Sequence, residues 1–486
     1  MKRALSTLLV LIMLCLLAVP AAVAAEEPYL VTMVISGEKQ QEDHQRIMDS
    51  VNEILRRDLN MELDLIVLPW GSAREQKRLM LTSGEPLDLM LTNQEESLSY
   101  LANGQLNDLD ELIDKYGTNI KATFGEEFYK SADIGGFIYG VPCLNEIGNV
   151  PCIGMRKDLV DKYNIDVSSI KTLEDMGPIF EIIKQNEPGI SPLHVSADQP
   201  PAKQLGMLDL MTDEVAVLPD AGLDSTEIIA ITDSEQYRNT LNTLHDWFMK
   251  GYINQDAATS SVSFESAFRA GDNFAAVMIW HPISPSSFGG KEMVYAMLGD
   301  HIARSGATGV LDYAIPINSK DPDKAMQMLD YLYGSPEVLQ LLNWGQEGVD
   351  YVYTDKANNL INYPDGVTAE TAKYHAQYAY NLPNQFLTSS WEGVYKPGVF
   401  EELKKFNTEG QRSKAFGFAF NPEGMENQLT ALMNVKEKYK SSLDTGSVDP
   451  EVYIPQFAQE LEQNGIRELI AAKQAQYDAW LGAQGK

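Results

Sequence analysis

Between residues 29 and 93, short apolar runs alternate with amphipathic ones, and this alternation constrains the fold more than any other feature of the chain. The runs YLVTMVIS (29–36), MELDLIVLPW (61–70) and PLDLMLTN (86–93) predict three strands. A helix is expected between the first two strands, because apolar residues recur there at helical spacing: Ile47, Val51, Ile54, Leu55 and Leu59. A second helix is expected over 72–85. This order predicts an α/β fold with a largely parallel sheet and helices on its faces.

The predicted sheet also indicates where a ligand would bind. In an open parallel sheet, ligands sit beyond the carboxyl ends of the strands, where the connections diverge. The residues at those ends are Trp70, Gly71 and Ser72 after the second strand, and Asn93, Gln94 and Glu95 after the third. We therefore expect ligand contacts from these two groups.

The rest of the chain continues the α/β pattern and then becomes helical. Further strands are expected at FIYGVP (137–142), NVPCIGMR (149–156), FAAVMIW (274–280), MVYAML (293–298) and GVLDYAIPI (309–317). From Asp323 onward most segments have helical periodicity, with Gly-Ser-Pro, Asn-Pro and Asp-Pro as helix boundaries. The C-terminal third is therefore predicted to be mainly helical.

The N-terminus predicts export from the cytoplasm. Two basic residues precede an apolar run, 4–19, and the small-residue stretch AAVAAEE. This is typical of a secretory signal peptide, residues 1–25, cleaved after Ala24 or Ala25. A membrane anchor is disfavoured because the run is shorter than the ~20 residues of a bilayer span. A lipid anchor at Cys15 is not expected either, because bulky residues precede it.

The charge of the chain disfavours polyanionic partners. Asp and Glu total 69 against 38 Lys and Arg, which gives a formal net charge of -31 at pH 7. Such an acidic surface repels nucleic acid and anionic membranes. We expect a soluble, monomeric mature chain, in the periplasm or at the cell surface, with no nucleic-acid partner.

Signatures of catalysis are mostly absent from the sequence. The six histidines form no HExxH pattern, and neither a phosphate-binding loop, a dinucleotide fingerprint nor a Gly-x-Ser-x-Gly elbow occurs. We therefore predict no cofactor, no metal and no enzymatic activity, while a structural calcium ion held by residues distant in the sequence stays open. A pair of carboxylates could still serve a glycosidase, but the helical C-terminal third argues against a barrel hydrolase.

Four tryptophans stand beside turn-forming or polar residues: Trp70, Trp280, Trp344 and Trp391. Burial in a core is the default for a large aromatic side chain and is expected for about half of them. An aromatic at a strand end can instead stack on a sugar while polar neighbours bind its hydroxyls. Trp70 and Trp280 fit this best, and His281 follows Trp280 directly.

The cysteines Cys143 and Cys152 raise a separate question. They lie nine positions apart, without a neighbouring histidine or third cysteine that would complete a metal set, and the spacing does not match a CxxC redox pair. A disulfide between them stays open, because sequence separation does not show whether the Cα atoms approach.

Beyond these patterns, the chain resembles extracellular solute-binding proteins of ABC importers, in the sugar-type group and its LplA-like branch with an extra C-terminal domain of unknown function. The motifs that carry the resemblance span nearly the whole mature chain in family order. They are LPWGSAREQKRLMLTSGEPLDLMLTN, NGQLNDLDELIDKYG, GGFIYGVPCLNEIG, GMRKDLVDKYNID, FRAGDNFAAVMIW, IPINSKDPDKAMQMLDYLYGSPEVLQLLNWGQEGVDY and AFGFAFNPEGMENQLTALMNVKEKY.

The resemblance implies two α/β lobes joined by crossing strands, with a ligand cleft that closes by a hinge motion. It places residues 26–144 and 309–345 in lobe one, and 145–308 and 346–486, with the helical C-terminal region, in lobe two. It also implies that Asn145 and Glu146 face the cleft in a crossing segment, and that Trp280 stacks on the ligand. The aromatic that maltose binders carry near Asn93 is missing here.

The function that follows is capture of a small solute, expected to be an oligosaccharide, for delivery to the transmembrane subunits of an ABC permease. A peptide or amino-sugar is the alternative ligand, because Glu95 and Glu146 could bind a positive charge. A secreted glycan hydrolase is the alternative activity.

Overall fold

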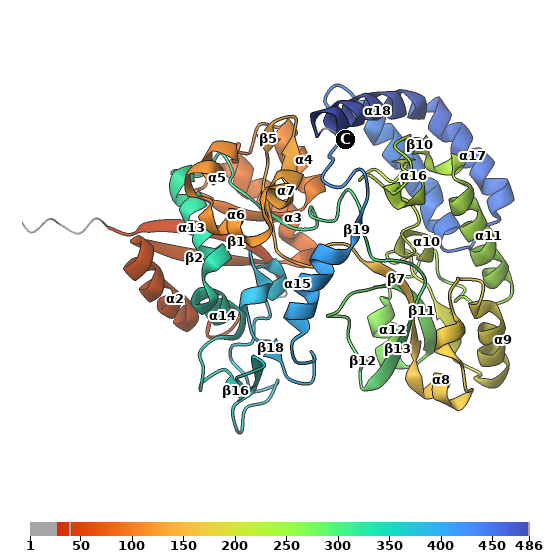
Figure 1. Cartoon of the computed structure of the whole chain (residues 1–486), viewed down its shortest axis with the longest axis horizontal. Helices are drawn as coiled ribbons and strands as arrows, with labels where there is room; N and C mark the ends of the chain where they lie inside the picture. Colours follow the sequence, from red (N-terminus) through yellow and green to blue (C-terminus); the bar gives the residue numbers. More distant parts are fainter. Residues whose placement is uncertain (1–26, 38–39, 485–486) are drawn as a thin grey trace, which may run out of the picture.

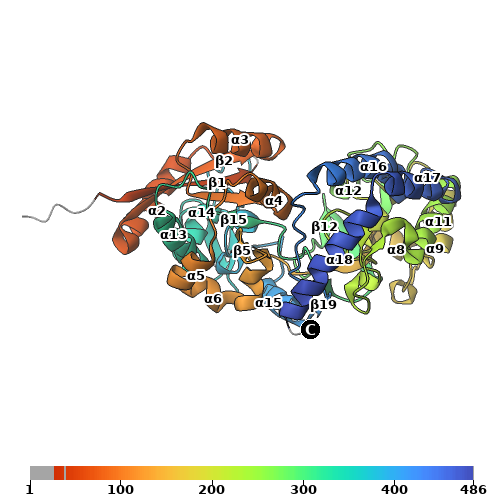
Figure 2. The same ribbon diagram turned by 90° about the horizontal axis from the view of Figure 1, so that it is seen from above.

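The computed structural model describes residues 27–37 and 40–484, which form two α/β lobes lying side by side (Figures 1 and 2). This confirms the expected bilobed α/β fold. The predicted signal peptide, including Cys15, lies outside the described residues. Within the described ranges, no helix has both the length and the apolar character needed to cross a membrane.

The first lobe is built on a five-stranded sheet with the order β2-β1-β3-β15-β6. Its strands are β1 (Tyr29–Gly37), β2 (Met61–Pro69), β3 (Leu89–Thr92), β6 (Val141–Pro142) and β15 (Asp312–Ala314). Strand β1 runs parallel to β2 and β3, as predicted, whereas β15 runs antiparallel to both β3 and β6. The chain thus leaves this sheet after β6 and returns to it through β15.

Helices cover the first sheet, and local signals set their ends. Helix α2 (His44–Leu59) ends at Asn60, which adopts φ 52°, and α3 (Trp70–Ser83) ends at Gly84 with φ 75°. Helix α13 (Pro322–Gly334) starts with Asp321 as its N-cap and a proline in its first turn. The other helices of this part are α4 (Gln94–Ala102), α5 (Asp110–Tyr116), α6 (Thr118–Phe124), α7 (Glu126–Tyr129) and α14 (Pro336–Trp344), beside the short pair β4 (Asp133–Ile134) and β5 (Phe137–Ile138).

The second lobe is built on another five-stranded sheet, with the order β12-β13-β7-β11-β8. Its strands are β7 (Val150–Arg156), β8 (Ser191–His194), β11 (Asn273–Trp280), β12 (Ser287–Phe288) and β13 (Lys291–Met297). Strand β7 is antiparallel to both β11 and β13. The helices around it are α8 (Lys157–Lys162), α9 (Met176–Asn186), α10 (Pro201–Gln204), α11 (Glu235–Met249) and α12 (Phe264–Ala270), with the small pair β9 (Ala216–Val217) and β10 (Ile229–Ala230).

The predicted C-terminal helices pack on this second lobe (Figure 1). They are α16 (Glu426–Asp444), α17 (Pro450–Gln463) and α18 (Ile466–Ala483). Their apolar side chains share one core with the strands: Leu432, Leu443, Phe457, Leu469 and Tyr477 are buried in the same cluster as Ile153 and Phe274. Helix α18 runs from this lobe toward its boundary with the first (Figure 2).

The segment between α14 and α16 differs from the expected division. Side chains of Tyr374, Leu382 and Leu403 fill the core of the first lobe, and Asn384 Nδ2 donates to Tyr333 O at 2.9 Å. This segment also carries β16 (Val352–Asp355), β17 (Leu360–Asn362), β18 (Ser390–Trp391) and α15 (Val399–Glu409). The assignment of 346–486 to lobe two therefore needs correction for residues 346–409, because helical periodicity predicts an element but not which lobe buries its apolar face.

Three segments cross between the lobes. Asn149 bridges to Ile302, and β14 (Ile302–Ala303) pairs in parallel with β19 (Gln411–Arg412). The two cysteines fall on either side of the first crossing. Cys143 is buried in the first-lobe core and Cys152 beside Phe268 and Met278 in the second lobe. Both thiols are free, so the disulfide left open from the sequence is not formed.

Candidate functional site

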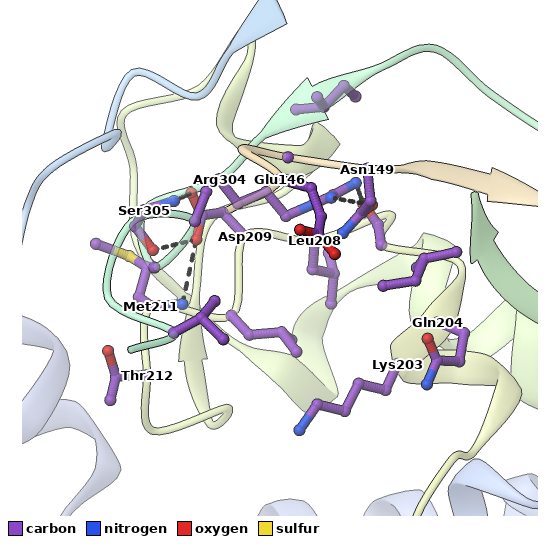
Figure 3. A pocket seen from close by; sticks show the side chains of 18 of the residues that line it. Glu146, Asn149, Lys203, Gln204, Leu208, Asp209, Met211, Thr212, Arg304 and Ser305 are labelled. Atoms are coloured by element: carbon purple, nitrogen blue, oxygen red, sulfur yellow. Dashed lines mark hydrogen bonds between the residues drawn. The ribbon is translucent and has the colours of Figure 1, made fainter. Parts of the chain in front are cut away.

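A cavity of about 640 Å³ lies between the lobes beside the crossing segments (Figure 3). Its walls come from the second lobe, from the crossing segments and from two first-lobe residues, Gln94 and Tyr380. The polar lining residues are Gln94, Glu146, Asn149, Lys203, Gln204, Asp209, Thr212, Glu214, His281, Arg304, Ser305 and Tyr380. Apolar lining comes from Leu208, Leu210, Met211, Ile279, Ile302, Ala307 and Val310. Mixed lining of this kind suits a ligand with both apolar and hydrogen-bonding faces.

The loop 209–214 of the second lobe forms one wall and has an unusual backbone. Met211, Thr212 and Glu214 have φ values of 45°, 76° and 63°, the left-handed region that disfavours side chains with a Cβ. Each such residue costs about 1–3 kcal/mol, so the surrounding structure must hold the loop in place.

Asp209 holds the start of this loop against two crossing segments. Its side chain is buried and accepts hydrogen bonds from the Ser305 N–H at 2.8 Å and from the Ser413 hydroxyl at 2.6 Å. It also accepts from the Ser305 hydroxyl at 2.5 Å and from the Met211 N–H at 3.3 Å, as Figure 3 shows. One carboxylate thus joins the loop to the segments after β14 and after β19.

The cations of the cavity are matched by protein acceptors. Lys203 Nζ lies 2.7 Å from Glu214 Oε1, and Arg304 Nη1 donates to Asn149 Oδ1 at 3.1 Å and, through Nη2, to Gly206 O. Burial lowers the pKa of the Arg304 guanidinium, while Asp209 raises it. The Lys203 charge is therefore paired within the protein, whereas the Arg304 guanidinium donates to two neutral acceptors and is influenced by the Asp209 carboxylate.

Glu146 stands where both lobes and a crossing segment meet. Gln385 Nε2, from the first lobe, donates to its Oε2 at 3.3 Å, and His281 Nε2, at the end of β11, lies 3.6 Å from its Oε1. Burial lowers the pKa of His281, and the Glu146 carboxylate opposes that shift. The Tyr380 side chain lines the same cavity and is 40% exposed.

A direct hydrogen bond crosses the cavity. Thr212 Oγ1, in the second-lobe loop, donates to Gln94 Oε1 at 3.0 Å, and Gln94 begins α4 of the first lobe. Of the residues that the sequence singled out, Gln94, Glu146 and His281 line this cavity. Their contact with a ligand stays a prediction.

The predicted residues at the end of β2 lie elsewhere. Trp70 is half-exposed and begins α3, and Ser72 accepts a hydrogen bond from Gln76 Nε2 at 2.7 Å within that helix. Neither residue lines the cavity. The tendency of ligands to bind beyond the carboxyl ends of parallel strands identifies one edge of the sheet. The lobes meet over only part of that edge, and Trp70 and Ser72 lie outside this part.

Three other predicted residues have structural partners. Asn93 is the N-cap of α4 and accepts from the Glu96 N–H at 2.9 Å, and Glu95 pairs with Arg74 at 2.9 Å in solvent. Asn145 is buried, donates to Tyr380 O at 3.0 Å and accepts from Gln385 Nε2 at 2.9 Å. None of these three side chains lines the cavity.

The tryptophans divide by their surroundings. Side chains alternate along a strand, so Ile279 and His281 share the cavity face of β11 while Trp280 points to the other face. There its ring meets Phe406 edge to face, with ring centroids 6.1 Å apart. Trp344 and Trp391 pack with centroids 5.0 Å apart in an aromatic cluster, and the Trp344 indole donates to Ser389 O. The packing of Trp344 and Trp391 agrees with the expectation that about half of the four tryptophans are buried in a core.

Sequence reasoning missed the main polar groups of the second-lobe wall: Lys203, Asp209, Thr212, Arg304 and Ser305. For Arg304 and Ser305, the sequence offered one signal: the segment 302–308 directly precedes the strand predicted to return to the first lobe. Left-handed residues other than glycine leave no mark in the sequence. Over residues 27–37 and 40–484, no three His, Cys, Asp or Glu side chains are grouped so that they could hold a metal ion.

Two lobes, crossing segments and an inter-lobe cavity define the class of the protein as a bilobed binding protein. Residues 58–338 match the bacterial extracellular solute-binding protein family, and the chain belongs to this family. Residues 414–482 match a domain of unknown function.

Similar proteins come from Streptococcus pneumoniae. A carbohydrate ABC transporter substrate-binding protein from the serotype 4 strain TIGR4 is 25% identical over 95% of this chain and 92% of its own length. A crystal structure of the N-glycan transport solute-binding protein NgtS is 24% identical with a TM-score of 0.83, covering 94% of this chain and 100% of that one. The same protein in complex with Man5GlcNAc is 25% identical with a TM-score of 0.74, covering 94% and 99%.

Proposed function

We propose that this protein captures an oligosaccharide between its lobes, without turnover, and delivers it to the transmembrane subunits of an ABC permease. The observation that carries the proposal is the inter-lobe cavity, whose lining combines the aromatic Tyr380 with the polar residues Glu146, Asn149 and Gln204. Aromatic faces stack on sugar rings, and carboxylate and amide groups bind sugar hydroxyls.

The charge balance of the cavity supports a neutral ligand. Lys203 and Glu214 pair with each other, and both oxygens of the Asp209 carboxylate already accept hydrogen bonds from hydroxyl and backbone amide donors. A cationic peptide or amino-sugar would have to compete with these partners, whereas neutral hydroxyl groups can add to them. The names of the streptococcal relatives point to the same ligand class.

We also propose that the protein works outside the cytoplasm, as a monomer, after removal of residues 1–25. Membership in an extracellular solute-binding family supports this location, and the acidic charge of the chain supports a soluble carrier. The residues that would form the signal lie outside the described ranges.

Isothermal titration of the mature chain with Man5GlcNAc and Man1GlcNAc tests the proposal. We expect saturable binding with one site and, after prolonged incubation, unchanged sugar by mass spectrometry. A shortened sugar would establish a hydrolase instead. If neither N-glycan nor a panel of other oligosaccharides binds while a basic peptide does, the proposed ligand class is wrong.

A further inference from the structure

The C-terminal helices contact the cavity wall through one fully buried lysine. Lys473, on α18, is 0% exposed, and its Nζ lies 2.9 Å from Met211 O, 2.9 Å from Ala216 O and 2.5 Å from Asp213 Oδ2. All three N–H donors of an ammonium group are therefore used. Two of these acceptors lie within the stretch 211–214, where Met211, Thr212 and Glu214 are left-handed, and the third belongs to Ala216, two residues beyond it.

Asp213 completes this connection from within the loop. Its Oδ1 accepts from the N–H groups of Val215 at 3.0 Å and Ala216 at 2.9 Å, while Oδ2 meets Lys473. The carboxylate is buried and does not line the cavity. The pair thus fixes the backbone from behind, on the side away from the ligand space.

Helix α16 provides further cations to the same loop. Lys436 Nζ and Lys440 Nζ each lie 3.9 Å from Glu214 Oε2, and Glu214 lines the cavity. The front of the loop meets the opposite lobe, where Thr212 donates to Gln94. A loop in a costly backbone conformation is therefore held between the C-terminal helices and the first lobe.

We infer that the C-terminal segment 414–482 serves to hold the ligand-facing loop in its left-handed conformation, with Lys473 as the positioning residue. Each N–H donor of Lys473 has an acceptor in residues 211–216, so its contacts with this loop are sufficient to explain why the lysine is buried. The inference goes beyond the solute-binding family, whose match ends at residue 338, and for its affinity measurement it rests on the proposed sugar-binding function.

The test compares two double variants. Lys473→Met with Asp213→Asn removes the buried ion pair without leaving a lone charge and keeps an acceptor for the Val215 and Ala216 N–H groups. Arg46→Met with Asp350→Asn removes a control ion pair in the first lobe, where the partly exposed Arg46 donates to a buried carboxylate. Neither Arg46 nor Asp350 lines the cavity.

Hydrogen exchange by mass spectrometry on the ligand-free variants is the first readout. We expect the amides of residues 211–216 to exchange at least about tenfold faster in the Lys473 variant and at the wild-type rate in the Arg46 variant. Affinity for Man5GlcNAc is the second readout, and we expect about a tenfold loss, equal to ~1.4 kcal/mol, in the Lys473 variant alone.

Unchanged exchange in 211–216 would overturn the inference, and so would wild-type affinity in the Lys473 variant. Equal losses of affinity in both variants would show that Lys473 only stabilises the protein in general, and this result would also contradict the inference. If the wild-type chain binds no glycan, the proposed function fails, but the exchange of the ligand-free loop still decides the role of Lys473.

Discussion

At the scale of single residues, Glu146 brings together the groups that the proposed ligand would meet. Gln385, His281 and the cavity surround its carboxylate, so one oxygen or both can accept from a sugar hydroxyl. Hydrogen bonds to charged groups contribute about 1.5–3 kcal/mol, more than those between neutral groups.

We therefore expect Glu146→Gln to weaken oligosaccharide binding by about 2 kcal/mol, measured by calorimetry. The matched control is Glu95→Gln, because Glu95 is an exposed carboxylate of the first lobe whose partner is Arg74. Equal affinity of the Glu146 variant and the wild type would remove Glu146 from the ligand contacts.

A second residue, His375, is expected to make the stability of the folded protein depend on pH. Burial against Trp344 and Trp391 lowers the pKa of His375 to about 4 from its ordinary value of 6.5. Between these two values the unfolded chain binds a proton that the folded chain does not, so the free energy of unfolding falls as the pH falls. A full proton corresponds to about 1.4 kcal/mol per pH unit, and the partly exposed ring contributes less.

We expect His375→Phe to lose less thermal stability than the wild type when the pH is lowered from 7 to 5. The Tm of both proteins, measured across this range, gives the comparison. His44, His281 and His301 also have lowered pKa values, so the wild type keeps part of its slope in either case. Parallel Tm profiles would show that His375 ionises equally in both states.

At the scale of elements, the arrangement of the lobes depends on the crossing segments and on what ties them together. Asp209 accepts from Ser305 and Ser413, which follow β14 and β19, so it links a second-lobe loop to two crossings. Burial leaves these donors no water as a replacement partner.

We expect Asp209→Asn to lower the free energy of unfolding by about 2 kcal/mol and to speed amide exchange in β14 and β19. Denaturant unfolding and hydrogen exchange measure the two effects. Asp330→Asn is the control, because Asp330 accepts the N–H groups of Asn119 and Ile120 inside the first lobe. A similar loss of stability without faster exchange at the crossings is expected there, and equal exchange in both variants would contradict the role of Asp209.

At the scale of the whole molecule, the question is which state of the lobes the structure represents. The lobes leave a cavity of about 640 Å³ between them, and Thr212 Oγ1 donates across it to Gln94 Oε1. We propose that the lobes are arranged as in the ligand-free state. The Thr212 to Gln94 contact would then be a first point of closure.

Small-angle X-ray scattering tests this proposal. We expect the radius of gyration to fall when Man5GlcNAc saturates the protein, because each lobe contributes part of the contacts and closure completes them. The same radius with and without bound sugar would mean that the lobes are already closed.

The sequence alone determined the local elements and the fold class. Apolar alternation predicted β1, β2 and β3, helical spacing predicted α2, and Gly84 marked the end of α3, because these features depend on neighbours a few residues apart. Position relative to the strands also pointed to Gln94 and His281, and the family resemblance to Glu146; all three line the cavity, and their contact with a ligand stays a prediction.

Only the tertiary structure decided which of these residues meet. The pleat of β11 turned Trp280 away from the cavity, residues 346–409 packed on the first lobe, and Lys473 came within reach of a loop more than 250 positions earlier in the chain. The left-handed backbone at Met211 and Thr212, and the hydrogen bonds that Asp209 accepts from Ser305 and Ser413, depend on contacts between distant segments. Contacts between distant segments leave no periodic pattern in the sequence, because periodicity reflects only residues a few positions apart. For that physical reason the second-lobe wall of the site could not be predicted from the sequence.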